Sequence, residues 1–222
     1  MNNSARERIF KRLKTAPVVA ATPDTGLKHT LSAPKMSRKE KIERLKTHME
    51  TVRTEVHLVK SSDWVKRLET IAKEKRFRTL MMSPEAPYGP AFQNDWPNDK
   101  EGLPALMTYG ENIEAFKSDL FEVDAALTST IGGIAEPGAI ILWPTEIEPR
   151  LMSLVPHVHI ALLEADKIYS SPAEAFDKLN WPDNIPTNAL LISGPSKTAD
   201  IEFILTFGVH GPKELILLII DD

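Results

Sequence analysis

The sequence contains no cysteine among its 222 residues. Its absence excludes disulfides, thiol nucleophiles, cysteine-bound zinc and any iron–sulfur cluster held by this chain's own thiolates. Whatever redox chemistry takes place near this protein, the chain does not carry it on sulfur.

Long apolar runs are also missing. The longest, Leu215–Ile220, has six residues, whereas a bilayer-spanning helix needs roughly 18. Basic residues interrupt the apolar residues of the N-terminal segment, so it does not resemble a secretory signal. An organelle transit peptide is an alternative interpretation of this segment, but the capping box Ser4-x-x-Glu7 favours a surface helix. We therefore expect no membrane span.

The common motifs of nucleotide, hydrolase and zinc-protease sites do not occur. There is no GxGxxG, GxSxG or HExxH. Lys197–Thr198 resembles the end of a phosphate-binding loop, but Gly194 is not adjacent to the lysine, and Ile192 stands where the motif needs its first glycine. A phosphate loop of the P-loop type is excluded.

Excess positive charge is absent as well. The net charge is -4 and the isoelectric point about 5.9, so the totals do not indicate the basic surface that binds nucleic acid. With 42% hydrophobic residues, the chain can bury a core without disulfides or a structural metal. We expect a globular protein with one main domain.

Two regions of different character divide the chain. Between residues 17 and 34, three prolines and a glycine interrupt polar residues that have no periodicity. A capping box, Ser37-x-x-Glu40, then opens a helix. We predict an N-terminal helical arm and linker over residues 1–36 and an α/β domain over residues 37–222.

The domain alternates short apolar segments with amphipathic ones. Such strands are typical of a parallel sheet covered on both faces, because they are buried on both sides. This pattern predicts an α/β fold with a mainly parallel sheet flanked by helices. Residues 84–104 have no period and are expected to form a long loop. The expected strands are Glu55–Val59, Thr79–Ser83, Val123–Leu127, Ala139–Trp143, Val158–Glu164, Ala189–Ile192 and Glu214–Ile220.

Two polar, glycine-bearing segments follow expected strands: "TSTIGGIAEPG" and "SGPSKTADIE". In open α/β sheets, ligands bind beyond the carboxyl ends of the strands, so these segments are expected to meet at one site. Glu136 in the first segment is a candidate general base, or else an ordinary turn residue.

The second segment, Ser193–Glu202, allows two interpretations. Its serine and threonine hydroxyls and free amides would bind anionic oxygen, with Asp200 orienting His210 or a substrate hydroxyl. Alternatively, Ser196 or Thr198 caps a helix whose first turn holds the acids. His210 stands between Gly208 and Gly211, which suits either a loop held close to a ligand or a structural turn.

Arg150 and two histidines complete the candidates. The Arg150 guanidinium would pair with Glu146 or Glu148, or with a substrate carboxylate. His157 and His159 would share one face of a strand and could offer two nitrogens to a metal; without a local third ligand, ordinary hydrogen-bonded strand histidines are favoured.

The segments "IAEPGAIIL", "EPRLMSLVPHVHIALLEADKI", "SGPSKTADIE" and "GVHGP" resemble, in order and spacing, the LUD-domain family. The resemblance is strong over residues 123–220. It implies a Rossmann-like fold related to the ribose-phosphate isomerase and CoA-transferase group. It also implies a cytoplasmic role in oxidising L-lactate to pyruvate with two iron–sulfur partner proteins.

The resemblance also selects residues. We predict Glu136, Asp200 and His210 as catalytic, and a ligand-binding set of Arg150, Ser193, Gly194, Ser196, Thr198 and Gly211. The remaining matched positions are Gly138, Pro156, His159 and Glu202. The chain has Pro137 where the family usually has threonine, which puts a hydroxyl contact there in doubt.

Two functions follow as expectations. In the first, the chain is an accessory, non-redox subunit that binds a small carboxylate or phosphate or organises the iron–sulfur subunits, and holds no cofactor or metal of its own. In the second, it is an independent enzyme acting on a phosphosugar, CoA ester or folate-type substrate.

Overall fold

The computed structural model describes residues 5–15, 35–97, 101–109, 120–181, 183, 186–199 and 205–222. The chain forms two compact units, residues 1–31 and 32–222. In the first unit, α1 (Ala5–Thr15) is an amphipathic helix that ends in basic residues. Ser4 of the first capping box lies outside the described residues. No described helix has the length and apolar character needed to cross a bilayer.

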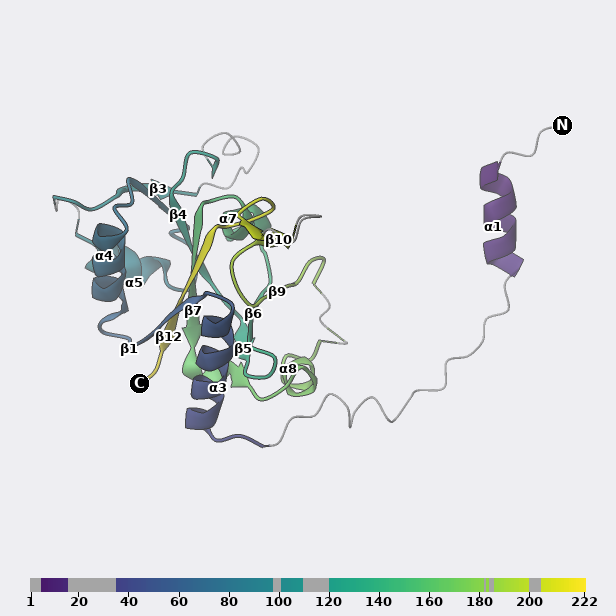
Figure 1. Ribbon diagram of the computed structural model, residues 1–222, viewed down its shortest axis with the longest axis horizontal. Coiled ribbons are helices and arrows are strands. Elements are labelled where there is room, and N and C mark those ends of the chain that lie inside the picture. Colours follow the sequence, from purple (N-terminus) through teal and green to yellow (C-terminus); the bar gives the residue numbers. More distant parts are fainter. Residues whose placement is uncertain are drawn as a thin grey trace. The chain divides into compact units, whose positions relative to one another are not determined.

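The second unit is built on a six-stranded sheet whose five strand pairings are all parallel. This sheet confirms the predicted α/β fold with a mainly parallel sheet (Figure 1). Its strands, in spatial order, are β1 (Glu55–Val59), β12 (Glu214–Ile220), β7 (Val158–Glu164), β4 (Ala125–Ser129), β2 (Thr79–Met82) and β3 (Ala105–Thr108).

Two helices cover one face of this sheet. They are α4 (Trp64–Glu74) and α5 (Gly89–Asp95). Their apolar side chains pack against strand residues such as Ile160 and Ile216. α5 lies within the segment expected to be a long loop, so that prediction was wrong. The prolines of this segment were interpreted as breaks in regular structure, but one of them occupies the first turn of α5, a position that suits proline.

The opposite face is covered by helices and a second sheet. α3 (Arg38–Thr51) opens at the predicted capping box, with Ser37 and Glu40 bonded reciprocally. Its buried residues Leu45 and Met49 pack on this face. The same face also carries α7 (Arg150–Leu154), whose Met152 is fully buried against β2 and β4.

The second sheet has four strands and mixed pairing. Its order is β8 (Ile168–Tyr169), β5 (Gly132–Ile134), β6 (Ala139–Leu142) and β9 (Leu190–Ile192). β6 pairs antiparallel with both β5 and β9. A 3-10 turn, η1 (Ala165–Lys167), connects β7 to β8. α8 (Pro172–Lys178), capped by Ser171, packs against β5 and β6.

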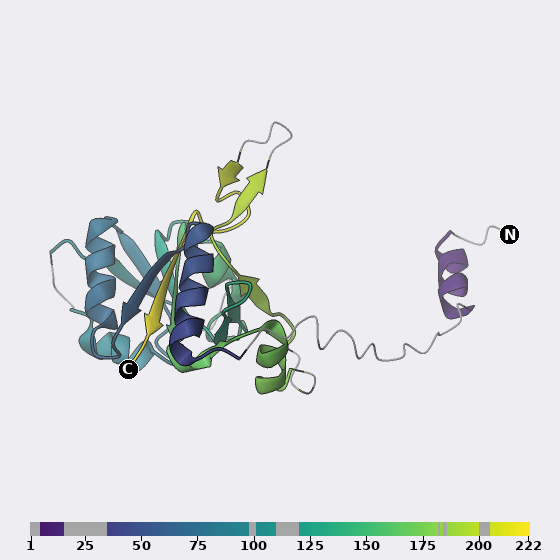
Figure 2. The ribbon, with the colours of Figure 1, turned by 60° about the horizontal axis from the view of Figure 1, so that its bottom comes forward.

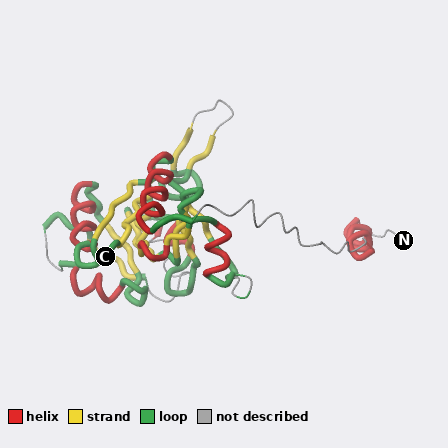
Figure 3. Tube along the Cα trace, turned by 90° about the horizontal axis from the view of Figure 1, so that it is seen from below, coloured by secondary structure: helices red, strands yellow, loops and turns green. Residues whose placement is uncertain are grey.

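The strands expected at residues 139–143 and 189–192 therefore form, but not in the parallel sheet. An antiparallel hairpin, β10 (Lys197–Ala199) and β11 (Leu205–Phe207), follows β9. It extends away from the body of the unit (Figures 2 and 3). The alternative in which Ser196 or Thr198 caps a helix does not hold for the described residues, because Lys197–Ala199 pairs as a strand with β11.

Candidate functional site

Glu136 lies against α3. The segment after β4 is not one loop, because β5 carries the chain away from the end of β4 before the turn at Glu136 begins. Its carboxylate accepts a hydrogen bond from Arg44 Nε at 2.7 Å and lies 3.3 Å from His48 Nε2. The Arg44 hydrogen bond is the main reason that the pKa of Glu136 is lowered. With 39% of its side chain exposed, Glu136 forms a surface ion pair.

Two predicted glycines pack on consecutive turns of the same helix. Gly138 has φ +85° and lies against His48 so closely that a Cβ atom would overlap the histidine Cβ. A Cβ on Gly194 would lie 2.9 Å from the carbonyl oxygen of Val52, one turn further along. The structure thus brings Glu136 and Ser193–Gly194 to one side of α3, which we call the α3 region (Arg44, His48, Val52, Glu136, Gly138, Ser193 and Gly194).

The Ser193 loop lies at the amino edge of the parallel sheet. Thr54, just before β1, donates to the carbonyl of Ser193 at 3.0 Å. The Ser196 amide donates to Pro212, just before β12, at 2.9 Å. The expectation that this loop lies at the carboxyl edge was wrong. β9 belongs to the mixed sheet, where the rule for parallel strands does not apply.

The remaining predicted residues are distributed around this loop. Thr198 pairs with Thr206 in the hairpin. Gly211 faces Ser196, whose Cβ lies 3.2 Å from the position of an added Cβ. His210 is exposed, and Pro156 is buried. Asp200 and Glu202 lie outside the described residues. No hydrogen bond or ion pair among the described residues joins Glu136 to Ser196 or His210, so their roles stay predictions.

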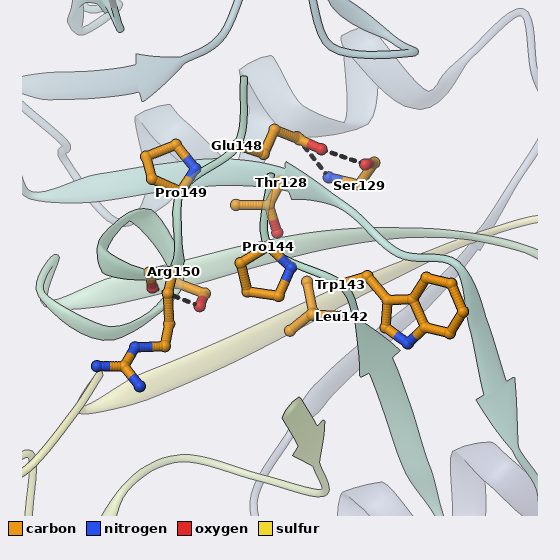
Figure 4. Close-up of a pocket in the computed structure, with 9 residues that line it drawn as sticks. Thr128, Ser129, Leu142, Trp143, Pro144, Glu148, Pro149 and Arg150 are labelled. Atoms are coloured by element: carbon orange, nitrogen blue, oxygen red, sulfur yellow. Dashed lines mark hydrogen bonds between the residues drawn. The ribbon is translucent and has the colours of Figure 1, made fainter. Parts of the chain in front are cut away.

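A different site lies at the carboxyl end of β4. A hollow of about 240 Å³, open to solvent, is found there. We call it the β4 cavity; Figure 4 shows its lining residues. They are Thr128, Ser129, Leu142, Trp143, Pro144, Glu148, Pro149, Arg150 and Ser153.

Glu148 is the acidic group of this cavity. Its carboxyl oxygens accept hydrogen bonds from the amide of Ser129 at 2.8 Å and from the Ser129 hydroxyl. Burial nevertheless outweighs these bonds and raises the pKa of Glu148. The sequence pattern assigned Glu148 only as a partner for Arg150. One signal in the sequence could have identified Glu148. It is an acid in a segment bounded by two prolines, Pro144 and Pro149, and this segment comes back to the end of the buried strand β4.

Thr128 forms the floor of the cavity with a buried histidine behind it. His159 Nε2 lies 2.8 Å from Thr128 Oγ1, and only 1% of His159 is exposed. Burial lowers the pKa of His159 to about 4, so the ring is neutral at physiological pH. Its Nδ1 has no hydrogen-bond partner among the described residues.

The two histidines do not share a strand face, as the metal-binding alternative would require. His157 precedes β7 and is exposed, whereas His159 lies inside the strand and is buried. Within the described ranges, no three side chains of the His, Asp or Glu type are arranged to hold a metal ion.

Arg150 provides the cation of the cavity. Its side chain is exposed and points away from Glu148 (Figure 4). It forms no ion pair with another described residue, so the expected pairing with Glu146 or Glu148 is not observed. Its guanidinium therefore stays available to a carboxylate or phosphate.

A second hollow of about 210 Å³ lies on the other side of the same strand end. It shares Thr128, Ser129 and Glu148 with the β4 cavity, and is also lined by Ser83 and Tyr88. The Tyr88 hydroxyl donates to Glu164 at 2.9 Å, and burial raises the pKa of this tyrosine. Both volumes include space that is open to solvent.

Known proteins show related sequences and a related fold. An uncharacterized protein of Neisseria meningitidis serogroup B is 32% identical over 222 residues, which cover 98% of this chain and 94% of the relative. The Bacillus mycoides protein named lactate utilization protein C 1 is 27% identical over 84% of this chain and 82% of its own.

The crystal structure of a DUF162 family protein from Deinococcus radiodurans has a TM-score of 0.56 at 16% identity. It covers 84% of this chain and all of the Deinococcus chain, and shows that the fold is shared. The model of the LUD domain matches residues 42–220, which include both the α3 region and the β4 cavity. The chain belongs to the LUD domain family.

Proposed function

We propose that this protein takes part in lactate utilisation as a non-redox subunit that works with iron–sulfur partner proteins in the cytoplasm. The observation that carries the proposal is similarity over most of the chain to a relative named lactate utilization protein C. Further relatives of that name, from Bacillus subtilis among others, match over shorter segments.

The absence of cysteine supports the accessory role. Oxidising lactate to pyruvate removes two electrons, and a chain without cysteine has no thiol and no thiolate-held cluster to accept them. In this proposal another subunit takes the electrons. This chain would contribute ligand binding or the organisation of the partners.

The β4 cavity supports the binding of a small anionic ligand. Arg150 is exposed without an ion-pair partner among the described residues, and the hydroxyls of Thr128 and Ser129 lie in the same hollow. Such groups recognise a carboxylate or phosphate.

Deletion of the gene tests the proposal. The deletion strain should fail to grow on L-lactate as sole carbon source and grow normally on pyruvate, and the intact gene on a plasmid should restore growth. Normal growth on lactate, in a strain without a second lactate dehydrogenase, would contradict the proposal. That result would point to the alternative, an independent enzyme acting on a phosphosugar, CoA ester or folate-type substrate.

Purification under anaerobic conditions tests the accessory role separately. The isolated chain should contain no iron, and a tagged chain should co-purify with iron–sulfur proteins when expressed in its own cell. Stoichiometric iron on the isolated chain would overturn this role.

A further inference from the structure

We propose that α1 docks on a partner protein by placing one face of the helix into an apolar groove lined with carboxylates. We call this face the docking face; it consists of Arg6, Ile9, Phe10 and Leu13. The inference rests on the proposed function and commits to its iron–sulfur partner as the protein that carries the groove. It concerns a segment outside the LUD domain, whose match begins at residue 42.

The first observation is an apolar stripe that α1 leaves open. Ile9, Phe10 and Leu13 have exposed fractions of 58%, 49% and 67%, and no residue of α1 is buried. Residues with this spacing lie on one side of an α-helix. A helix of 11 residues is only marginally stable when it stands alone in water. Contact between this stripe and a partner would therefore stabilise the helix and bury apolar surface.

The second observation is that a cation lies on the same side of the helix. The docking face follows the spacing i, i+3, i+4 and i+7, which is typical of helices that bind in grooves of other proteins. Its first position is Arg6, whose guanidinium lies 5.2 Å from the centre of the Phe10 ring. A protein groove can offer this cation a carboxylate, whereas the hydrocarbon of a lipid surface cannot. The position of Arg6 thus favours a protein over a membrane.

The third observation is the charge of the helix. Of the 11 residues of α1, five are basic and one is acidic, so its net charge is +4. The whole chain has a net charge of -4, so the rest of the chain has -8. Positive charge is thus concentrated on this helix, beside the apolar stripe. A groove with acidic residues along its rim is complementary to α1, and such complementarity speeds the encounter of two proteins and excludes wrong partners.

Co-purification from the protein's own cell tests the docking face. The full-length chain with a C-terminal tag, produced in the deletion strain, should retain an iron–sulfur protein, identified by its mass spectrum, iron content and visible absorption. This iron–sulfur protein is then released with salt, and its affinity for the immobilised full-length chain is measured. Phe10→Ala and Leu13→Ala should each weaken the binding by at least about tenfold, because a few anchoring side chains carry most of the binding free energy.

Arg6→Gln and Lys11→Gln form a matched pair. Each removes one positive charge from α1, but Arg6 lies on the docking face and Lys11 on the opposite side of the helix. Arg6→Gln should weaken the binding by at least about fivefold, and Lys11→Gln by less than about twofold. Thermal melts of all four variants should match that of the unaltered chain, since no residue of α1 is buried.

Three results would overturn the inference. The first is equal binding by the unaltered chain and by both alanine variants. The second is retention of no iron–sulfur protein by the unaltered chain. The third is self-association in sedimentation, or binding to vesicles of anionic phospholipid, that Phe10→Ala abolishes while the iron–sulfur protein is still retained; the helix would then cover a second copy or a lipid surface.

Growth of the deletion strain separates this inference from the proposed function. Weakened binding by the docking-face variants, together with normal growth of the deletion strain on L-lactate, would support the docking and overturn the function alone. Equal binding by these variants, together with failure of the deletion strain to grow on L-lactate, would overturn the docking alone.

Discussion

The α3 region and the β4 cavity each contain one glutamate and one arginine, but the surroundings of these residues differ. Glu136 is part of a surface ion pair with Arg44, and the glycines beside it are packed against a helix. Glu148 is held by Ser129 in a partly enclosed hollow, and its neighbour Arg150 is not used for an ion pair among the described residues.

The difference shows that residues of a recognisable motif can be required for packing. In the α3 region, the described contacts of Gly138 and Gly194 explain why a side chain would not fit there. In the β4 cavity, the partly buried carboxyl of Glu148 and the buried imidazole of His159 have pKa values shifted in the directions that disfavour charge. Shifted groups of this kind cluster at functional sites.

The largest effect is expected at Gly138. Gly138→Ala would place a side chain on a residue with φ +85° and against the Cβ of His48. Neither the backbone at residue 138 nor that at His48 can move easily to make room. Loss of at least about 3 kcal/mol in the free energy of unfolding is expected, from left-handed strain plus overpacking. Urea denaturation measures it.

Gly102→Ala is the matched control. Gly102 has nearly the same dihedral, φ +81°, but no described atom lies within 4 Å of its added Cβ. Only the conformational cost of about 1 kcal/mol should remain. If both variants lose the same stability, the packing of Gly138 on α3 is not what requires glycine.

An intermediate effect is expected from His159. Its pKa is about 4 in the folded chain and 6.5 for the ordinary residue. As the pH falls, the unfolded chain takes up the proton first, so stability present above pH 6.5 is lost progressively down to pH 4. Between pH 7 and pH 5 this should lower the free energy of unfolding by about 2 kcal/mol.

Glu148 should act in the opposite direction. Its folded pKa is raised, so the carboxyl favours the folded state at acidic pH, and this contribution is lost as the pH rises through the folded pKa. Urea denaturation at pH 7, 6 and 5 should show a flatter pH dependence for His159→Gln and a steeper acid loss for Glu148→Gln. Unchanged slopes in both variants would contradict this assignment of buried groups.

The smallest effect on stability is expected at Glu136. Because the ion pair with Arg44 is largely exposed and screened by solvent, Glu136→Gln should cost less than about 1 kcal/mol. Its complementation of a deletion strain on L-lactate is the informative measurement. Full growth would remove Glu136 from the catalytic set, whereas lost growth at unchanged stability would favour the α3 region as a site.

Much of the fold could be predicted because its signals are local. The capping box at Ser37 and the largely apolar strand at Glu214–Ile220 each depend on neighbouring residues, and each forms as expected. Membership of the family was likewise readable from short segments. α5 was missed because prolines signal both interruption and the first turn of a helix.

The candidate site was less predictable because it depends on which sheet each strand joins. The composition of Leu190–Ile192 suits a strand, but nothing in those residues says that β9 pairs with β6, and this pairing moves the Ser193 loop to the amino edge. Arg150 was recognised from its chemistry. Arg150 does not pair with Glu148, because Glu148 is hydrogen-bonded instead to Ser129, nineteen positions earlier.

The sequence by itself thus determined most of the elements, the class of fold and the absence of cysteine chemistry, since periodicity, capping and composition act over a few residues. Only the tertiary structure decided where polar groups meet. The charge state of Glu148 and His159 depends on burial by segments distant in the chain, and the apolar surroundings that shift their pKa values exist only after the strands have paired.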